Sequence, residues 1–181
     1  SSTDPSGGVF YPDYFGKNFV LNDLTHDGGL TAIRIEGPTN SVDQRVNRLS
    51  KELGLLNQEL SILDSEQSNI FWNRTKNLEV FRSLKSNLLR IVLPMSETLQ
   101  VIQKLKNFEI KYFIDWGGGL IWASFDQLNT KILSEIKDTV KKHQGYITLI
   151  KVEEDLKASA DIFTIDPIKY KISEKIKRSF D

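Results

Sequence analysis

The chain has 181 residues, of which 39% are hydrophobic and 27% charged, the composition of an ordinary soluble globular domain. Its 24 Lys and Arg residues balance 24 Asp and Glu residues. We therefore expect no nucleic-acid-binding surface, because binding to phosphates needs a local excess of cations. The absence of cysteine excludes disulfides, thiolate metal ligands, cysteine nucleophiles and cysteine-bound iron–sulfur clusters in this chain.

No apolar segment approaches the ~20 residues of a membrane-spanning helix, so we expect no membrane span. Residues 1–8 are polar and lack the apolar core of a signal peptide. Together with the absence of cysteine, these features predict a cytoplasmic protein. The two histidines, His26 and His143, are far apart and follow no metal-binding spacing, so we expect no metal site.

The first 29 residues are predicted to be an irregular lead-in segment, although they carry enough aromatic side chains to pack on a neighbour. Alternating and β-branched residues predict a strand over residues 30–36, which Gly37 and Pro38 end. The spacing of apolar residues then predicts a helix from Asn40 or Ser41, a strand over 59–63, a helix over 65–81, a strand over 88–93, and a helix that Ser96 caps.

Two predicted strands, over residues 108–114 and 120–125, enclose a glycine-rich turn. They are followed by a helix over 130–143 that Gly145 ends, a strand over 146–152, and a last helix that starts near Pro167. The basic residues near the C-terminus are interpreted as the solvated face of this helix: Lys169, Lys171, Lys175, Lys177 and Arg178.

This order of elements resembles two β-α-β units, the second with an added hairpin. It predicts an α+β fold in which helices cover one face of a mainly antiparallel sheet. We expect one domain over residues 30–181, preceded by the lead-in segment.

The glycine triplet Gly117–Gly119 is the most informative motif. It lies between two strands, so it matches neither a phosphate-binding P-loop nor the glycine fingerprint of a dinucleotide-binding fold. Asp115, Trp116 and Trp122 flank it. These residues could line a pocket for a flat ring or a small acid, or they could be core aromatics and an aspartate that caps the turn.

Trp72 and Lys76 are four residues apart on a predicted helix and share one of its faces. A cation at this position could hold a substrate carboxylate through charge-assisted hydrogen bonds. The alternative is a core tryptophan that is shielded by the aliphatic stem of the lysine.

Six segments, taken in chain order, carry a family resemblance: Leu30–Pro38 with Ser41, Val42 and Arg45; Phe71-Trp72; Leu89–Pro94; Asp115–Trp122; Gly145–Lys151; and Ile176–Asp181. They resemble the C-terminal half of the glycolate oxidase E-subunit family, a branch of the FAD-linked oxidases related to vanillyl-alcohol oxidase and D-lactate dehydrogenase. The Asp-Trp-Gly-Gly-Gly-Leu-x-Trp string of residues 115–122 is the most specific of these segments.

The resemblance implies a ferredoxin-like cap domain that covers an FAD bound mainly by an N-terminal domain absent from this chain. It further implies oxidation of a small 2-hydroxy acid such as glycolate, no activity of the chain alone, and partnership with a homologous flavin subunit and an iron–sulfur subunit. The alternatives are a non-catalytic, partner-binding domain of a multi-subunit flavin oxidase and a ferredoxin-like domain that binds a small molecule.

The chain departs from the family pattern at positions that bear on the site. Lys76 and Lys151 stand at or near positions where the family usually has arginine, and lysine lacks the bidentate fork of arginine. Residues 115–119 stand where related subunits carry a histidine-containing metal motif. The resemblance therefore predicts flavin-face or substrate contacts at Asp115, Trp116, Gly117, Gly118, Gly119, Trp122, Trp72, Lys76 and Lys151, without a metal.

Overall fold

The computed structural model describes residues 3–16, 28–54, 60–84, 87–159 and 167–180. The chain divides into two compact units, and each is described by itself. Unit 1 contains residues 1–84 and 112–118, and unit 2 contains residues 85–111 and 119–181. The described residues form six β-strands and several helices, and the strand pairs within each unit are antiparallel, so the predicted α+β fold is confirmed.

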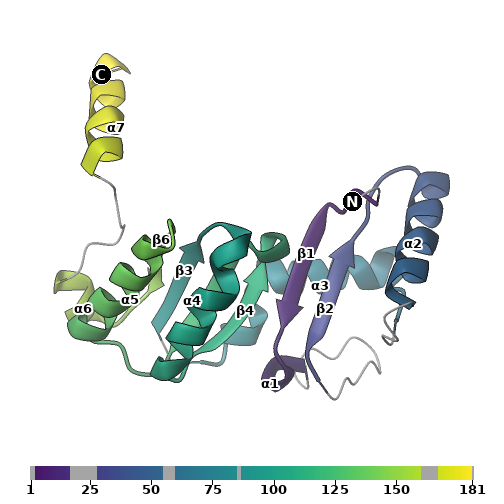
Figure 1. Cartoon of the computed structure of the whole chain (residues 1–181), viewed down its shortest axis with the longest axis horizontal. Helices are drawn as coiled ribbons and strands as arrows, with labels where there is room; N and C mark the ends of the chain where they lie inside the picture. Colours follow the sequence, from purple (N-terminus) through teal and green to yellow (C-terminus); the bar gives the residue numbers. More distant parts are fainter. Residues whose placement is uncertain (1–2, 17–27, 55–59, 85–86, 160–166, 181) are drawn as a thin grey trace. The chain divides into compact units, whose positions relative to one another are not determined.

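Strand β1 (Gly7–Tyr11) is central to unit 1. It pairs antiparallel with β2 (Leu30–Arg34) along its whole length, and with β4 (Lys111–Asp115) through Phe10 and Ile114. The helices of this unit are α1 (Asp13–Gly16), α2 (Thr39–Gly54) and α3 (Ser65–Lys76), followed by a 3₁₀ turn (Glu79–Phe81). Helix α3 crosses behind β1 and β2 in Figure 1.

An aromatic cluster forms the core of unit 1 around Tyr11, which is fully buried. The Tyr11 ring lies 4.8 Å from that of Phe113 and 6.3 Å from that of Phe71. Its hydroxyl donates to Thr75 Oγ1 at 3.0 Å, and the Thr75 hydroxyl donates to the Phe71 carbonyl. Burial raises the pKa of Tyr11, so the phenol stays neutral. These contacts fasten α3 to β1.

Unit 2 is built on β3 (Asn87–Val92), which pairs with β5 (Leu120–Phe125) on one side and β6 (Tyr146–Lys151) on the other. Helices α4 (Thr98–Leu105) and α5 (Thr130–Lys142) contact each other and lie in front of these strands in Figure 1. Alternate residues of the strands form the buried face: Leu89, Ile91, Ile121, Ala123 and Ile147. Helices α6 (Glu154–Ser159) and α7 (Pro167–Phe180) follow.

Most predicted elements are confirmed within a few residues, but the predicted lead-in is wrong where the structure describes it. Gly7–Tyr11 is a strand and Asp13–Gly16 a helix, because this segment is held by strand pairing and by the aromatic core. Tyr14 also fixes α1 to β4: its hydroxyl donates to the Tyr112 carbonyl and accepts from the Tyr112 N–H. Residues 17–27, with His26, lie outside the described residues.

The predicted strand over 59–63 is wrong for its described residues. Residues 60–64 have no strand partner, and the Ile62 side chain is 70% exposed. The segment leads into a capping box instead: Asp64 Oδ1 accepts from the Gln67 N–H at 2.8 Å, and Gln67 Oε1 accepts from the Asp64 N–H at 3.2 Å. Helix α3 is therefore fixed at its start by local polar contacts.

Two boundaries and one short helix also differ from the sequence-based expectations. Helix α3 ends at Lys76, because Leu78 takes a left-handed conformation with a φ of 53°. Ser96 lies in a 3₁₀ turn (Met95–Glu97) and does not cap α4. Helix α6 was not predicted; it is only 6 residues long, too short for a clear helical period.

Gly145 provides a test of packing in unit 2. A Cβ atom there would lie 2.7 Å from Val140 Cγ1 and 2.8 Å from the Val92 carbonyl oxygen. We expect Gly145→Ala to lower the free energy of unfolding by about 1–3 kcal/mol through overpacking, measured by denaturant unfolding. Gly54→Ala is the matched control, since nothing lies within 4 Å of its Cβ position. Equal stability of the two variants would contradict the close packing at Gly145.

Candidate functional site

The turn after β4 has an unusual backbone. Trp116, Gly117 and Gly118 have φ values of 54°, 60° and 118°, all in the left-handed region. Such a conformation is uncommon for a bulky residue such as tryptophan and costs about 1–3 kcal/mol. Trp116 is nevertheless 56% exposed as a whole residue, so burial does not explain this conformation.

Backbone contacts hold this turn against β1. A Cβ atom on Gly8 would lie 3.3 Å from the Gly117 Cα, so the two backbones are in close approach. A side chain at Gly117 itself would meet nothing within 4 Å. The glycines therefore serve the turn and the close approach to β1, and they leave one side of the turn without side chains.

Asp115 occupies the start of the turn and is half-buried. Its Oδ1 accepts from the Trp116 N–H at 2.7 Å, which is the turn-capping contact that the sequence left as an alternative. Burial raises the pKa of Asp115, and this hydrogen bond partly offsets the effect. Its charge in turn contributes to the raised pKa of Tyr11. The carboxyl group is thus more easily protonated than an exposed aspartate.

Trp72 lies on the face of β1 opposite to the one that Gly117 approaches. A Cβ atom on Gly7 would lie 3.2 Å from Trp72 Cη2, so the indole rests on the bare backbone of that glycine. The cation over the Trp72 ring is Arg34, whose Cζ is 5.9 Å from the ring centroid. Arg34 also forms an ion pair with Glu36 at 3.0 Å.

Lys76 shares a helix with Trp72 but is exposed at the C-terminal end of α3. Arg34, which comes from β2, is not among the site residues that the sequence predicts. Its partner Trp72 is far away in the sequence, and only the pairing of Arg34 with Gly7 brings the two side chains together. A prediction of which strands pair would have been needed to find it.

Three of the predicted site residues belong to unit 2. Trp122 is half-buried and lies opposite Arg90, which in turn lies opposite Thr148, so the three residues form a row across β5, β3 and β6. This row is on the face opposite to the core residue Ile91. Lys151 is exposed at the end of β6, and the Gly119 carbonyl accepts from the Leu93 N–H at 3.1 Å.

The predicted site residues therefore fall into two groups. Asp115, Trp116, Gly117, Gly118, Trp72 and Lys76 belong to unit 1, while Gly119, Trp122 and Lys151 belong to unit 2. Within unit 1, the turn and Trp72 are both seated on the Gly7-Gly8 step of β1.

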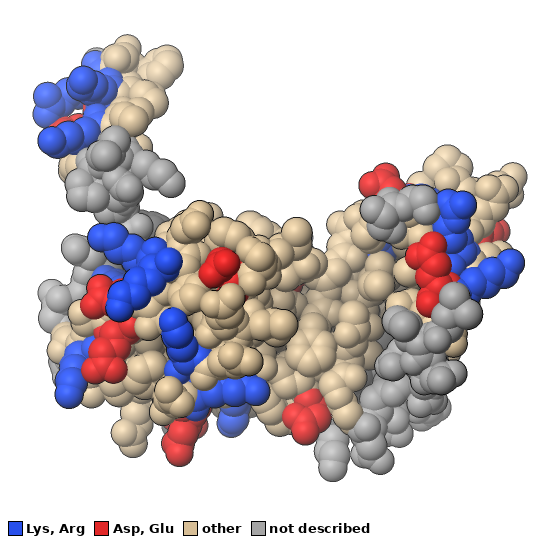
Figure 2. Space-filling model, in the orientation of Figure 1, with Lys and Arg blue, Asp and Glu red and all other residues tan. Residues whose placement is uncertain are grey.

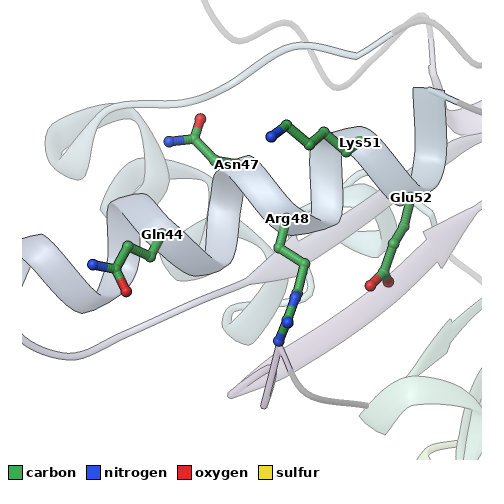
Figure 3. A pocket seen from close by; sticks show the side chains of 5 residues that line it. All are labelled: Gln44, Asn47, Arg48, Lys51 and Glu52. Carbon is green, nitrogen blue, oxygen red and sulfur yellow. The ribbon is translucent and has the colours of Figure 1, made fainter.

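A surface depression along α2 offers no comparable chemistry. Its lining residues all come from this one helix, and in Figure 3 their side chains point in different directions: Gln44, Asn47, Arg48, Lys51 and Glu52. Within the described ranges, no three His, Cys, Asp or Glu residues are grouped so that they could hold a metal ion.

The described helices include none that is both long and apolar enough to cross a membrane. Lys and Arg side chains gather along one side of α7 in Figure 2. The described basic residues of that helix are all exposed, as the sequence predicted.

No protein-family model matches the chain, and a comparison with curated proteins finds no similar sequence.

The protonation of Asp115 can be tested through its effect on stability. Because the folded-state pKa of Asp115 is raised, its charged form opposes folding, and this penalty disappears as the pH falls below about 4, the pKa of an unfolded aspartate. We expect Asp115→Asn to be more stable than the wild type at pH 7, with a difference that shrinks on acidification. Thermal unfolding between pH 7 and pH 3.5 measures this difference.

Asp115→Ala is the control, because it removes the acceptor of the Trp116 N–H as well as the charge. We expect it to be less stable than Asp115→Asn at every pH. A wild type that is as stable as Asp115→Asn at pH 7 would contradict an unfavourable carboxylate at this position.

Proposed function

We propose that this chain is the substrate-side domain of an FAD-dependent oxidoreductase that acts on a small 2-hydroxy acid such as glycolate. The sequence resemblance over residues 30–181 and the α+β fold support this proposal. The single observation that carries it is the turn of residues 115–118, where an exposed indole is held in a strained backbone conformation beside bare glycine backbone.

This turn suits contact with a flat ring. Backbone strain at an exposed residue more often reflects function than packing. Packing alone would not favour a strained conformation at such a residue. Trp116 supplies an apolar plane with one hydrogen-bond donor, and the open side of Gly117 lets a planar group approach the backbone. An isoalloxazine ring held by another domain has the matching shape.

Arg34 supports recognition of an acid in the same unit. Its planar fork binds a carboxylate through two hydrogen bonds, which Lys76 and Lys151 cannot do. Its present partner, Glu36, is 53% exposed, and exposed ion pairs of this kind contribute only about 0–1 kcal/mol. A substrate carboxylate could therefore replace Glu36 at little cost.

The FAD, when bound, supplies hydride acceptance, and the chain's own residues position the substrate and exclude water. The carboxyl of Asp115, with its raised pKa, is able to take up or release a proton nearer to neutral pH than an exposed aspartate. In this proposal the partners are an FAD-binding domain, a homologous flavin subunit and an iron–sulfur subunit, and the compartment is the cytoplasm.

A non-catalytic, partner-binding domain is the second candidate, and the surface of α7 favours it. Ile172 and Ile176 are 53% exposed and Phe180 is 87% exposed, which is typical of a helix face that another protein covers. Aromatic residues near the N-terminus give it less support than the sequence suggested, since Tyr11 and Phe15 are buried in unit 1.

The test is to express the chain together with any coding sequence that precedes Ser1. We expect a yellow protein with flavin absorbance, which glycolate or lactate bleaches without oxygen. Trp116→Ala should slow bleaching by tenfold or more, about 1.4 kcal/mol at the transition state, whereas Trp116→Phe retains a ring and should slow it less. A colourless product that rejects added FAD would contradict the proposal, and co-purification of that product with a separate flavin subunit would favour the second candidate.

A further inference from the structure

Three polar side chains of unit 2 form a hydrogen-bonded chain that shares no residue with the proposed flavin site. His143 Nδ1 is 2.6 Å from Glu97 Oε2, and His143 Nε2 is 2.9 Å from Lys104 Nζ. His143 caps the C-terminal end of α5, Lys104 lies in the last turn of α4, and Glu97 directly precedes α4. The packing of α4 against α5 brings the three together.

The hydrogen-bonding capacity of each group fixes the position of the proton. An ammonium group only donates, so Nε2 of His143 accepts from Lys104. An ionised carboxylate only accepts, so the proton of the imidazole is on Nδ1, which donates to Glu97. The result is a neutral imidazole whose basic nitrogen faces an amine and whose other nitrogen is held by a carboxylate. This is the order of groups in which a carboxylate orients a base beside a nucleophile.

Among these three residues, the difference in exposure suits a reaction of Lys104 with a soluble reagent. The His143 side chain is only 11% exposed and that of Glu97 is 28% exposed, while Lys104 is exposed. The base is thus held by packing, and the amine is accessible. The other charged groups near His143 in its own helix are Lys141 and Lys142, in the last turn of α5.

We propose that Lys104 is an acylation site, at which His143 acts as the base and Glu97 positions the imidazole. The substrate class is an activated acyl donor, such as an acyl phosphate. This inference is independent of the proposed flavin chemistry, which uses other residues.

Acylation of Lys104 combines a proton transfer to His143 with displacement of phosphate at the acyl carbon. The Lys104 ammonium gives one proton to His143 Nε2, and the freed Nζ lone pair attacks the acyl carbon. A C–N bond forms, the bond between the acyl carbon and the phosphate oxygen breaks, and phosphate leaves with that electron pair. The leaving phosphate takes the second proton of the nitrogen, and the His143 imidazolium releases its proton to water, which leaves a neutral amide on Lys104.

The experiment treats the folded chain with acetyl phosphate at pH 8 and follows each lysine by mass spectrometry. Lys106 is the internal control, because it is exposed, lies two residues away in the same unit and forms no part of the Glu97–His143–Lys104 chain. We expect Lys104 to react about tenfold faster than Lys106. This rate advantage is smaller than the one that a general base provides in a buried site, because Lys104 is exposed.

Two variants separate the base from its support. His143→Gln keeps hydrogen-bonding groups but removes the base, and it should bring Lys104 to the rate of Lys106. Glu97→Gln should reduce the advantage in part, and the rate at Lys106 should stay unchanged in both. Equal rates at Lys104 and Lys106 in the wild type, or an advantage that persists in His143→Gln, would overturn the proposal; the wild-type comparison needs no variant to fold.

Discussion

Two consecutive glycines in β1 allow two other segments to touch its backbone, one on each face. On one face the Trp72 indole lies over Gly7, and on the other the turn after β4 approaches Gly8 through Gly117. Side chains at successive positions of a strand point to opposite faces, so a side chain at either glycine would displace one of these two neighbours. The positions of the Trp72 indole and of the turn after β4 therefore both depend on this absence of side chains.

The same strand also contributes to the aromatic core of unit 1. Two residues beyond Val9, Tyr11 is fully buried among aromatic rings and fastens α3 through its hydrogen bond to Thr75. A buried Tyr11 hydroxyl without a hydrogen-bond partner would be unfavourable. The need to keep Thr75 within reach therefore fixes the position of α3, and the bond also stabilises it. The ring of Trp72 is consequently placed by the helix position that Tyr11 and Thr75 determine. A rigid core next to a strained, exposed turn is an arrangement typical of a binding site.

Unit 2 shows how polar groups are arranged around a regular apolar core. Alternate strand residues such as Ile91 and Ile121 are fully buried, while Arg90 and Trp122 point to the opposite face. The Glu97–His143–Lys104 chain lies at the C-terminal end of α5, where His143 contacts a residue before α4 and a residue in its last turn. The Trp122–Arg90–Thr148 row and the Glu97–His143–Lys104 group cannot be recognised from residue spacing, since each joins segments far apart in the sequence.

The sequence by itself determined the fold class, most of the strands and helices of residues 30–181, and the glycine turn, because these depend on local periodicity and on residues that favour turns. It did not determine that residues 7–11 form a strand, since two glycines weaken the local preference and only pairing with β2 and β4 stabilises it. The partners of Trp72 and His143 were likewise decided by tertiary structure, through the strand pairing that brings Arg34 to Trp72 and the helix packing that brings Lys104 and Glu97 to His143. Contacts between residues distant in the chain leave no local signal, because they arise only when whole elements pack.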